Sequence, residues 1–128
     1  MTKFSAFFCD EVRQEITGKH FLIGVYSGDL IPATTPSSFP LSALVRVQGL
    51  KGKHHFKVRM LSPDGSVSME IEDDVDVPEQ ADCFPIAFSG AIIQVAAPGY
   101  VSIEVTLDQG EPEVIATLRV HSPDMEFK

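Results

Sequence analysis

The sequence has few cysteines, no long apolar run and a shortage of positive charge. Its two cysteines, Cys9 and Cys83, are too few and too far apart in sequence for a zinc site, and a reducing compartment keeps such residues as thiols. No apolar stretch approaches the roughly 20 residues that span a bilayer, and the apolar run before Asp10 is shorter than the roughly 7–15 residues of a secretory signal. We therefore expect a cytoplasmic protein with no membrane interaction.

Positive charge is scarce, with ten lysines and arginines against eighteen acids and a formal net charge of −8. A negative average field repels nucleic acid. A local basic strip runs through residues 46–59, but it lacks the regular aromatic residues of a single-strand binding groove. We expect no nucleic-acid partner.

Catalytic and cofactor motifs are also missing. No glycine loop of the Walker or dinucleotide kind is present, and Ser27-Gly28 and Ser89-Gly90 lack the strand-to-helix elbow that activates a serine. The adjacent histidines His54 and His55 point to opposite faces of a strand and cannot chelate one metal ion without other ligands. The sequence therefore predicts a protein that is not an enzyme and needs no cofactor.

What the sequence does contain is apolar alternation with a period of two. Residues 55–61 and 66–72 alternate on either side of the turn Pro63-Asp64-Gly65, and residues 100–107 and 114–120 alternate around a second turn, which predicts two hairpins. Further strands are expected at 3–9, 20–26, 44–50 and 84–95. Eight or nine short strands predict one domain over residues 1–128, an all-β, two-sheet antiparallel sandwich of the immunoglobulin-like kind.

Two segments break this rhythm and are expected to be loops. Residues 27–42 carry three prolines, so we expect them to cross an edge or an end of the sandwich. Residues 72–82 are rich in acids, and the acidic loop at 70–82 offers oxygen ligands for calcium; the metal-ligand candidates are Glu72, Asp73, Asp74 and Asp76. The alternative is a solvated connection whose charge discourages edge pairing.

A charged stretch near the amino terminus raises a second question. One helical turn here would bring Asp10 towards Arg13, with Glu15 and Lys19 following in the loop. The residues are compatible with a surface ion pair of at most about 1 kcal/mol or with a working surface. On the alternating strand at 55–61, His55, Lys57 and Arg59 form a second polar face.

The same stretch resembles a family of uncharacterised bacterial proteins that share the pattern Asp-x-x-Arg-x-Glu, then Gly-Lys, then a strand ending Gly-x-Tyr. Here the pattern is carried by Asp10, Arg13, Glu15, Gly18, Lys19, Gly24 and Tyr26, together with the Pro63-Asp64-Gly65 turn. The resemblance implies a small cytoplasmic β-sandwich and suggests that the charged stretch is a shared surface. It implies no activity and no catalytic residue.

We expect a non-enzymatic module that binds another protein or itself through the Asp10 to Lys19 stretch or the face bearing His55. Binding of a ligand or of calcium by the acidic 70–82 segment is the alternative. A small hydrolase using Cys9, Asp10 and Glu15 is a third, weaker hypothesis.

Overall fold

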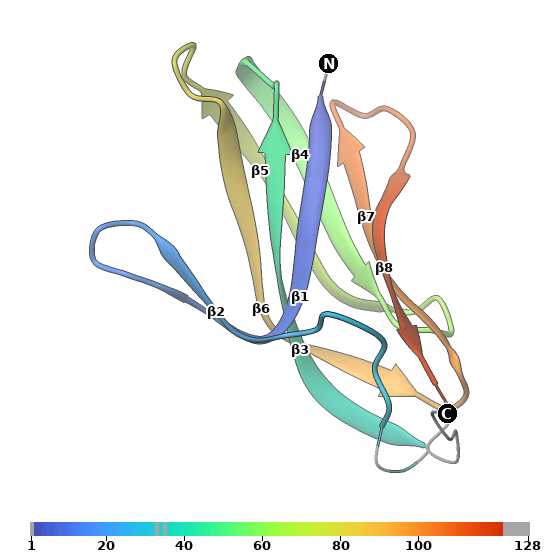
Figure 1. The fold of residues 1–128 in the computed structure, drawn as a ribbon. Helices are drawn as coiled ribbons and strands as arrows, with labels where there is room; N and C mark the ends of the chain where they lie inside the picture. The colour runs from blue at the N-terminus through green and yellow to red at the C-terminus, as the bar shows by residue number, and fades with distance from the viewer. Residues whose placement is uncertain (1, 33, 35, 122–128) are drawn as a thin grey trace.

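The computed structural model describes residues 2–32, 34 and 36–121, which form eight β-strands and no helix (Figure 1). The strands are β1 (Lys3–Gln14), β2 (His20–Val25), β3 (Ser37–Gln48), β4 (Gly52–Leu61), β5 (Val67–Val77), β6 (Cys83–Val95), β7 (Gly99–Leu107) and β8 (Glu113–Val120). One antiparallel sheet has the order β2-β1-β3-β6 and the other the order β5-β4-β7-β8. The prediction of an all-β, two-sheet sandwich is confirmed. The described part of the chain contains no helix that is long and apolar enough to cross a membrane.

The core lies between the two sheets because alternate side chains of each strand point inwards. Phe88 and Leu41 from the first sheet and Met60 and Ile103 from the second are fully buried. Burial of each such side chain stabilises the fold by about 1.5–3 kcal/mol relative to exposure. This shared layer positions the loops and the sheet edges discussed below.

Both predicted hairpins form, as β4–β5 and β7–β8. In the first turn Gly65 has a φ of +87°, and the carboxylate of Asp64 accepts hydrogen bonds from the backbone and hydroxyl of Ser66. In the second turn two residues without the freedom of glycine, Asp108 and Gln109, have φ values of +51° and +65°. That turn is therefore strained and needs support from its surroundings.

The prediction that residues 27–42 form a loop is wrong in its second half, because β3 begins at Ser37 and contains Pro40. Pro40 pairs with Ile92 of β6, whereas β1 pairs with β3 only as far as Ser42. Pro40 therefore lies where β3 has a single neighbour, and its missing N–H is tolerated as it is on an edge strand.

The acidic segment at 72–82 is also not a loop over its first half, because β5 continues to Val77. Val75 packs against the core and Val77 is buried, so alternation continues through the acids. Acidic residues disfavour strands on average, but here the outward-facing Glu72, Asp74 and Asp76 lie opposite basic residues of β4, and this tertiary contact overrides the propensity.

Candidate functional site

A two-stranded arm projects from the body of the sandwich (Figure 1). Beyond Cys9, β1 leaves β3 and pairs only with β2, so residues 10–25, the hairpin arm, extend past the first sheet. Phe21, Ile23 and Val25 alternate along β2 and are 53%, 45% and 46% exposed. β2 is an edge strand of the first sheet, so the arm presents an apolar row beside an open backbone edge.

At the base of the arm, Asp10 is packed against Gly24 and Tyr26. The hydroxyl of Tyr26 donates to Asp10 Oδ1 at 3.1 Å, and burial, followed by this hydrogen bond, raises the pKa of Tyr26. Gly24 has a φ of +68°, and a Cβ added to it would lie 2.2 Å from Asp10 Oδ2. The Asp10 carboxylate thus fills the space that a side chain at position 24 would need. Asp10, Gly24 and Tyr26, three residues of the amino-terminal pattern, therefore lie together at this point.

The other charged residues of the stretch do not converge on Asp10. The predicted helical turn is wrong, because β1 continues to Gln14 and places Asp10 and Arg13 on opposite faces. Arg13 instead pairs with Glu11, with Nε 2.8 Å from Oε1, in an exposed contact. In the arm's turn the backbone N–H of Glu15 donates to the carbonyl of Lys19 at 2.7 Å.

Sequence reasoning missed a groove between the end of the arm and the outer face of the first sheet. Its lining residues are Lys19, His20, Leu44, Arg46, Cys83 and Pro85, and its volume is about 480 Å³. Leu44 and Arg46 alternate with core residues of β3, so they point away from the core. No local sequence signal marks this groove, because its walls come from segments up to 66 residues apart, from Lys19 to Pro85.

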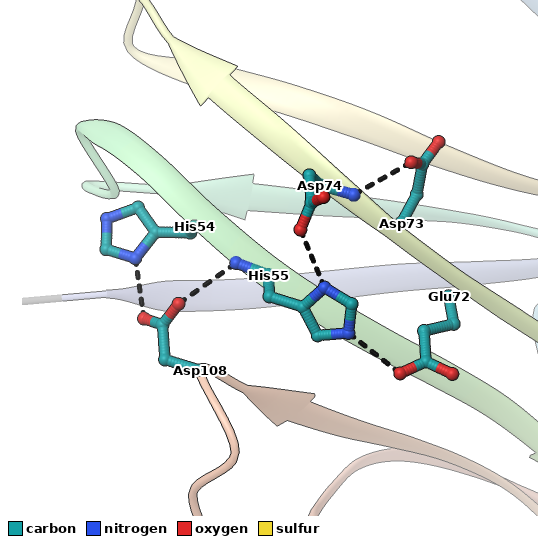
Figure 2. Close-up of polar contacts among 6 residues, drawn as sticks. All are labelled: His54, His55, Glu72, Asp73, Asp74 and Asp108. Atoms are coloured by element: carbon teal, nitrogen blue, oxygen red, sulfur yellow. Dashed lines mark hydrogen bonds and ion pairs between the residues drawn. The ribbon is translucent and has the colours of Figure 1, made fainter.

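The polar face on β4 is the centre of a charge ladder that spans β4 and β5. His55, Lys57 and Arg59 lie opposite the acids of β5, in the register His55↔Asp74, Lys57↔Glu72 and Arg59↔Glu70. Both ring nitrogens of His55 contact carboxylates, Nδ1 to Asp74 Oδ1 and Nε2 to Glu72 Oε2, each at 2.7 Å (Figure 2). The basic strip and the acidic segment predicted from the sequence are therefore partners of one another.

Electrostatic pairing continues along the ladder. Hydrogen bonds to the carboxylates of Glu72 and then Asp74 raise the pKa of His55, and the bond with His55 lowers the pKa of Glu72. Arg59 lies between Glu70, 3.4 Å from its Nε, and Glu104 of β7, 3.5 Å from its Nη1. The first of these contacts is close enough for an ion pair but lacks hydrogen-bond geometry, because Nε has no hydrogen-bond partner.

His54 supports the strained β7–β8 turn from β4. Its Nδ1 lies 2.6 Å from Asp108 Oδ2, while the backbone N–H of His55 donates to the other carboxylate oxygen at 3.0 Å (Figure 2). The bond to Asp108 raises the pKa of His54, and the same bond lowers the pKa of Asp108. These contacts hold the left-handed conformation of Asp108 in place.

The candidate calcium ligands Glu72, Asp73, Asp74 and Asp76 are spread along a strand and do not surround one point. Asp73 and Asp74 point to opposite faces, and Asp73 Oδ1 accepts the backbone N–H of Asp74 at 2.8 Å. Within residues 2–32, 34 and 36–121, no group of three or more His, Cys, Asp or Glu side chains is placed to hold a metal ion. Calcium binding stays a prediction.

The hydrolase candidates Cys9, Asp10 and Glu15 lie in different chemical environments. Cys9 is fully buried, and burial raises the pKa of its thiol, although its contact with the Glu11 carbonyl acts in the opposite direction. A thiol held protonated in this way is a poor nucleophile. Glu15 lies in the arm's turn, where its carboxylate accepts the hydroxyl of Thr17 at 2.9 Å.

Comparison with known proteins agrees with an uncharacterised domain and adds no activity. No curated protein matches the chain. A family of unknown function, DUF6941, matches residues 5–121, which include the hairpin arm, the groove and the charge ladder. The chain therefore belongs to this family of unknown function.

Proposed function

We propose that this protein is a non-enzymatic module that binds another protein or a second copy of itself through the hairpin arm. The observation that carries the proposal is the apolar row of Phe21, Ile23 and Val25 on an edge strand outside the sandwich. A two-stranded extension is marginally stable by itself in water, and an apolar row beside an open edge is a site where further strands add. A bound partner would stabilise the extension and would cover both the apolar row and the open edge.

The mode of binding that fits this edge is strand addition. A partner strand pairing with β2 would satisfy its free backbone groups, and side chains on alternate positions would cover Phe21 and Ile23. The rest of the arm supports this arrangement, since the contacts of Asp10 with Gly24 and Tyr26 hold its base to the sandwich.

The polar face bearing His55 is a weaker candidate for the contact. Its cations already have carboxylate neighbours from β5 and β7, so a charged partner would have to compete with those ion pairs. Exposed pairs of this kind are each worth little, but together they leave little unbalanced charge for recognition. We therefore assign the contact to the arm.

We further propose an immunoglobulin-like classification and a bacterial, cytoplasmic setting. The classification is supported by the strand order, in which β1-β3-β6 and β5-β4-β7-β8 form the two facing sheets. The cytoplasmic location is supported by the two free thiols, Cys9 and Cys83, and the bacterial origin rests on the resemblance of the amino-terminal pattern alone.

The test compares an arm variant with a matched surface variant. Phe21→Ser/Ile23→Ser removes the apolar row, while Val67→Ser/Val114→Ser removes side chains of similar exposure, 44% and 56%, from the second sheet. Light scattering over a concentration series measures self-association, and affinity capture from the native host followed by mass spectrometry finds other partners. We expect an association that the arm variant loses and the control keeps. Equal behaviour of the two variants, or a monomer that captures nothing, would refute the proposal.

A further inference from the structure

The groove beside the arm gathers positive charge on an acidic protein. Three of its lining residues, Lys19, His20 and Arg46, carry or can carry a positive charge, and the other three are Leu44, Cys83 and Pro85. No carboxylate lines the groove, although acids outnumber lysines and arginines by eighteen to ten in the whole chain. The groove therefore has a local charge opposite to that of the molecule.

These three cations have no ion pair among the residues that the structure describes. Lys53 and Arg119 also have no ion pair in this part of the chain, so the groove differs from the rest of the surface in gathering its cations within one lining that contains no carboxylate. Among the described residues, the one side-chain hydrogen bond of the Arg46 guanidinium is to a thiol, with Nη2 3.3 Å from Cys83 Sγ. A guanidinium has five donors, so most of the hydrogen-bonding capacity of Arg46 stays available to a ligand.

The two sides of the groove differ in a way that suits an extended chain. Lys19 and His20 come from the end of the arm, whereas Leu44 and Arg46 come from β3 and Pro85 from β6. A segment lying between these walls would meet cations on both sides and apolar surface beneath. Alternating acidic and apolar side chains match that arrangement, because successive side chains of an extended segment point in opposite directions.

We propose that this groove docks an extended acidic segment of a partner protein, in which carboxylates pair with Lys19 and Arg46 and apolar side chains contact the exposed Pro85, with Leu44, which is only 8% exposed, in the floor beneath. The inference rests on the proposed binding function and specifies the partner's chemistry. The net charge of −8 opposes the approach of an acidic partner at long range. At physiological ionic strength this repulsion is screened beyond about 8 Å, whereas contacts inside the groove are shorter than this and are weakened less by salt.

The probe is a fluorescein-labelled peptide, Glu-Phe-Asp-Leu-Glu-Phe-Asp-Leu, measured by fluorescence anisotropy against the full chain. One control peptide has lysine in place of every acid, and a second has serine in place of every apolar residue. The protein variant Lys19→Gln/Arg46→Gln removes two groove cations, and Lys53→Gln/Arg119→Gln removes two cations that lie outside the groove. Far-UV circular dichroism checks that each variant is folded.

We expect the acidic peptide to bind the wild type more tightly than either control peptide. The groove variant should lose about tenfold in affinity, which corresponds to 1.4 kcal/mol, while the other variant keeps wild-type affinity. Wild-type affinity should also fall as salt rises, a readout that needs no variant. The inference would be overturned if all peptides bound equally, if both protein variants lost the same affinity, if binding did not depend on salt, or if no peptide bound. Self-association that depends on Lys19 and Arg46 would also overturn it.

These outcomes are separable from failure of the proposed function. If the Phe21→Ser/Ile23→Ser variant loses a partner but the acidic peptide does not bind, the arm is a binding surface and the groove assignment is wrong. If the arm variant keeps every association of the wild type, the proposed function itself fails.

Discussion

Replacing Gly24 by alanine should destabilise the base of the hairpin arm by about 2–3 kcal/mol. About 1–2 kcal/mol arises because an alanine at a φ of +68° places its Cβ against the backbone. About 1 kcal/mol more arises because the new Cβ would lie 2.2 Å from Asp10 Oδ2, which must move and release the hydrogen bond from Tyr26. Urea unfolding followed by far-UV circular dichroism measures the total, and amide hydrogen exchange in β2 shows whether the arm opens first.

The chain contains a matched control for this substitution. Gly90 has a φ of +70°, but a Cβ there would meet nothing within 4 Å, so Gly90→Ala reports the backbone cost alone. In an Asp10→Ala background the carboxylate is gone and only the Cβ of residue 10 remains close, at 3.1 Å, so the cost of Gly24→Ala should fall towards that of Gly90→Ala, about 1–2 kcal/mol. If Gly24→Ala costs no more than Gly90→Ala in the wild type, the carboxylate does not occupy that space and the reasoning is refuted.

Three further predictions concern the histidines of β4, the β7–β8 turn and the start of β3. Because the pKa values of His54 and His55 are raised, their contribution to stability is complete below their ordinary value of 6.5 and is lost as pH rises through the raised values. The pKa of Asp108 is lowered, so its contribution to stability is present above its ordinary value of 3.8 and is lost as pH falls through the lowered value. Melting temperatures measured from pH 3 to 9 should therefore be highest between pH 3.8 and 6.5. Gln109→Gly should raise the free energy of unfolding in urea by about 0.5–1 kcal/mol, because glycine tolerates the φ of +65° and Asp-Gly suits a tight hairpin. An unchanged free energy of unfolding would contradict strain at this turn. Ser37→Ala should be neutral or stabilising by up to about 1 kcal/mol in the same assay, because its buried hydroxyl has no hydrogen-bond partner among the residues that the structure describes; a clear loss of stability would show that the hydroxyl is satisfied.

Local pattern was sufficient to predict the fold class and two of the hairpins. Strict alternation in residues 55–61 and 100–107 specifies a strand with one buried face, and Pro63-Asp64-Gly65 specifies a tight reversal. Both signals arise within about ten residues, and therefore they are visible without knowledge of the fold. Prediction failed where a residue's neighbours came from another strand, as for the acids of β5 and for Pro40 in β3.

The sequence by itself determined the alternation, the turns and the amino-terminal pattern of this protein, because these depend on residues close together along the chain. Only the tertiary structure decided which charged residues lie next to residues of opposite charge. Strand pairing sets the acids of β5 against the basic residues of β4, which turns two separate predicted sites into one ladder of opposite charges. The departure of β1 from β3 exposes the arm and brings its end opposite Arg46, which leaves that arginine, Lys19 and His20 without carboxylate partners among the described residues. Such pairings join residues far apart in the chain, and the choice among them is made by burial of the shared core.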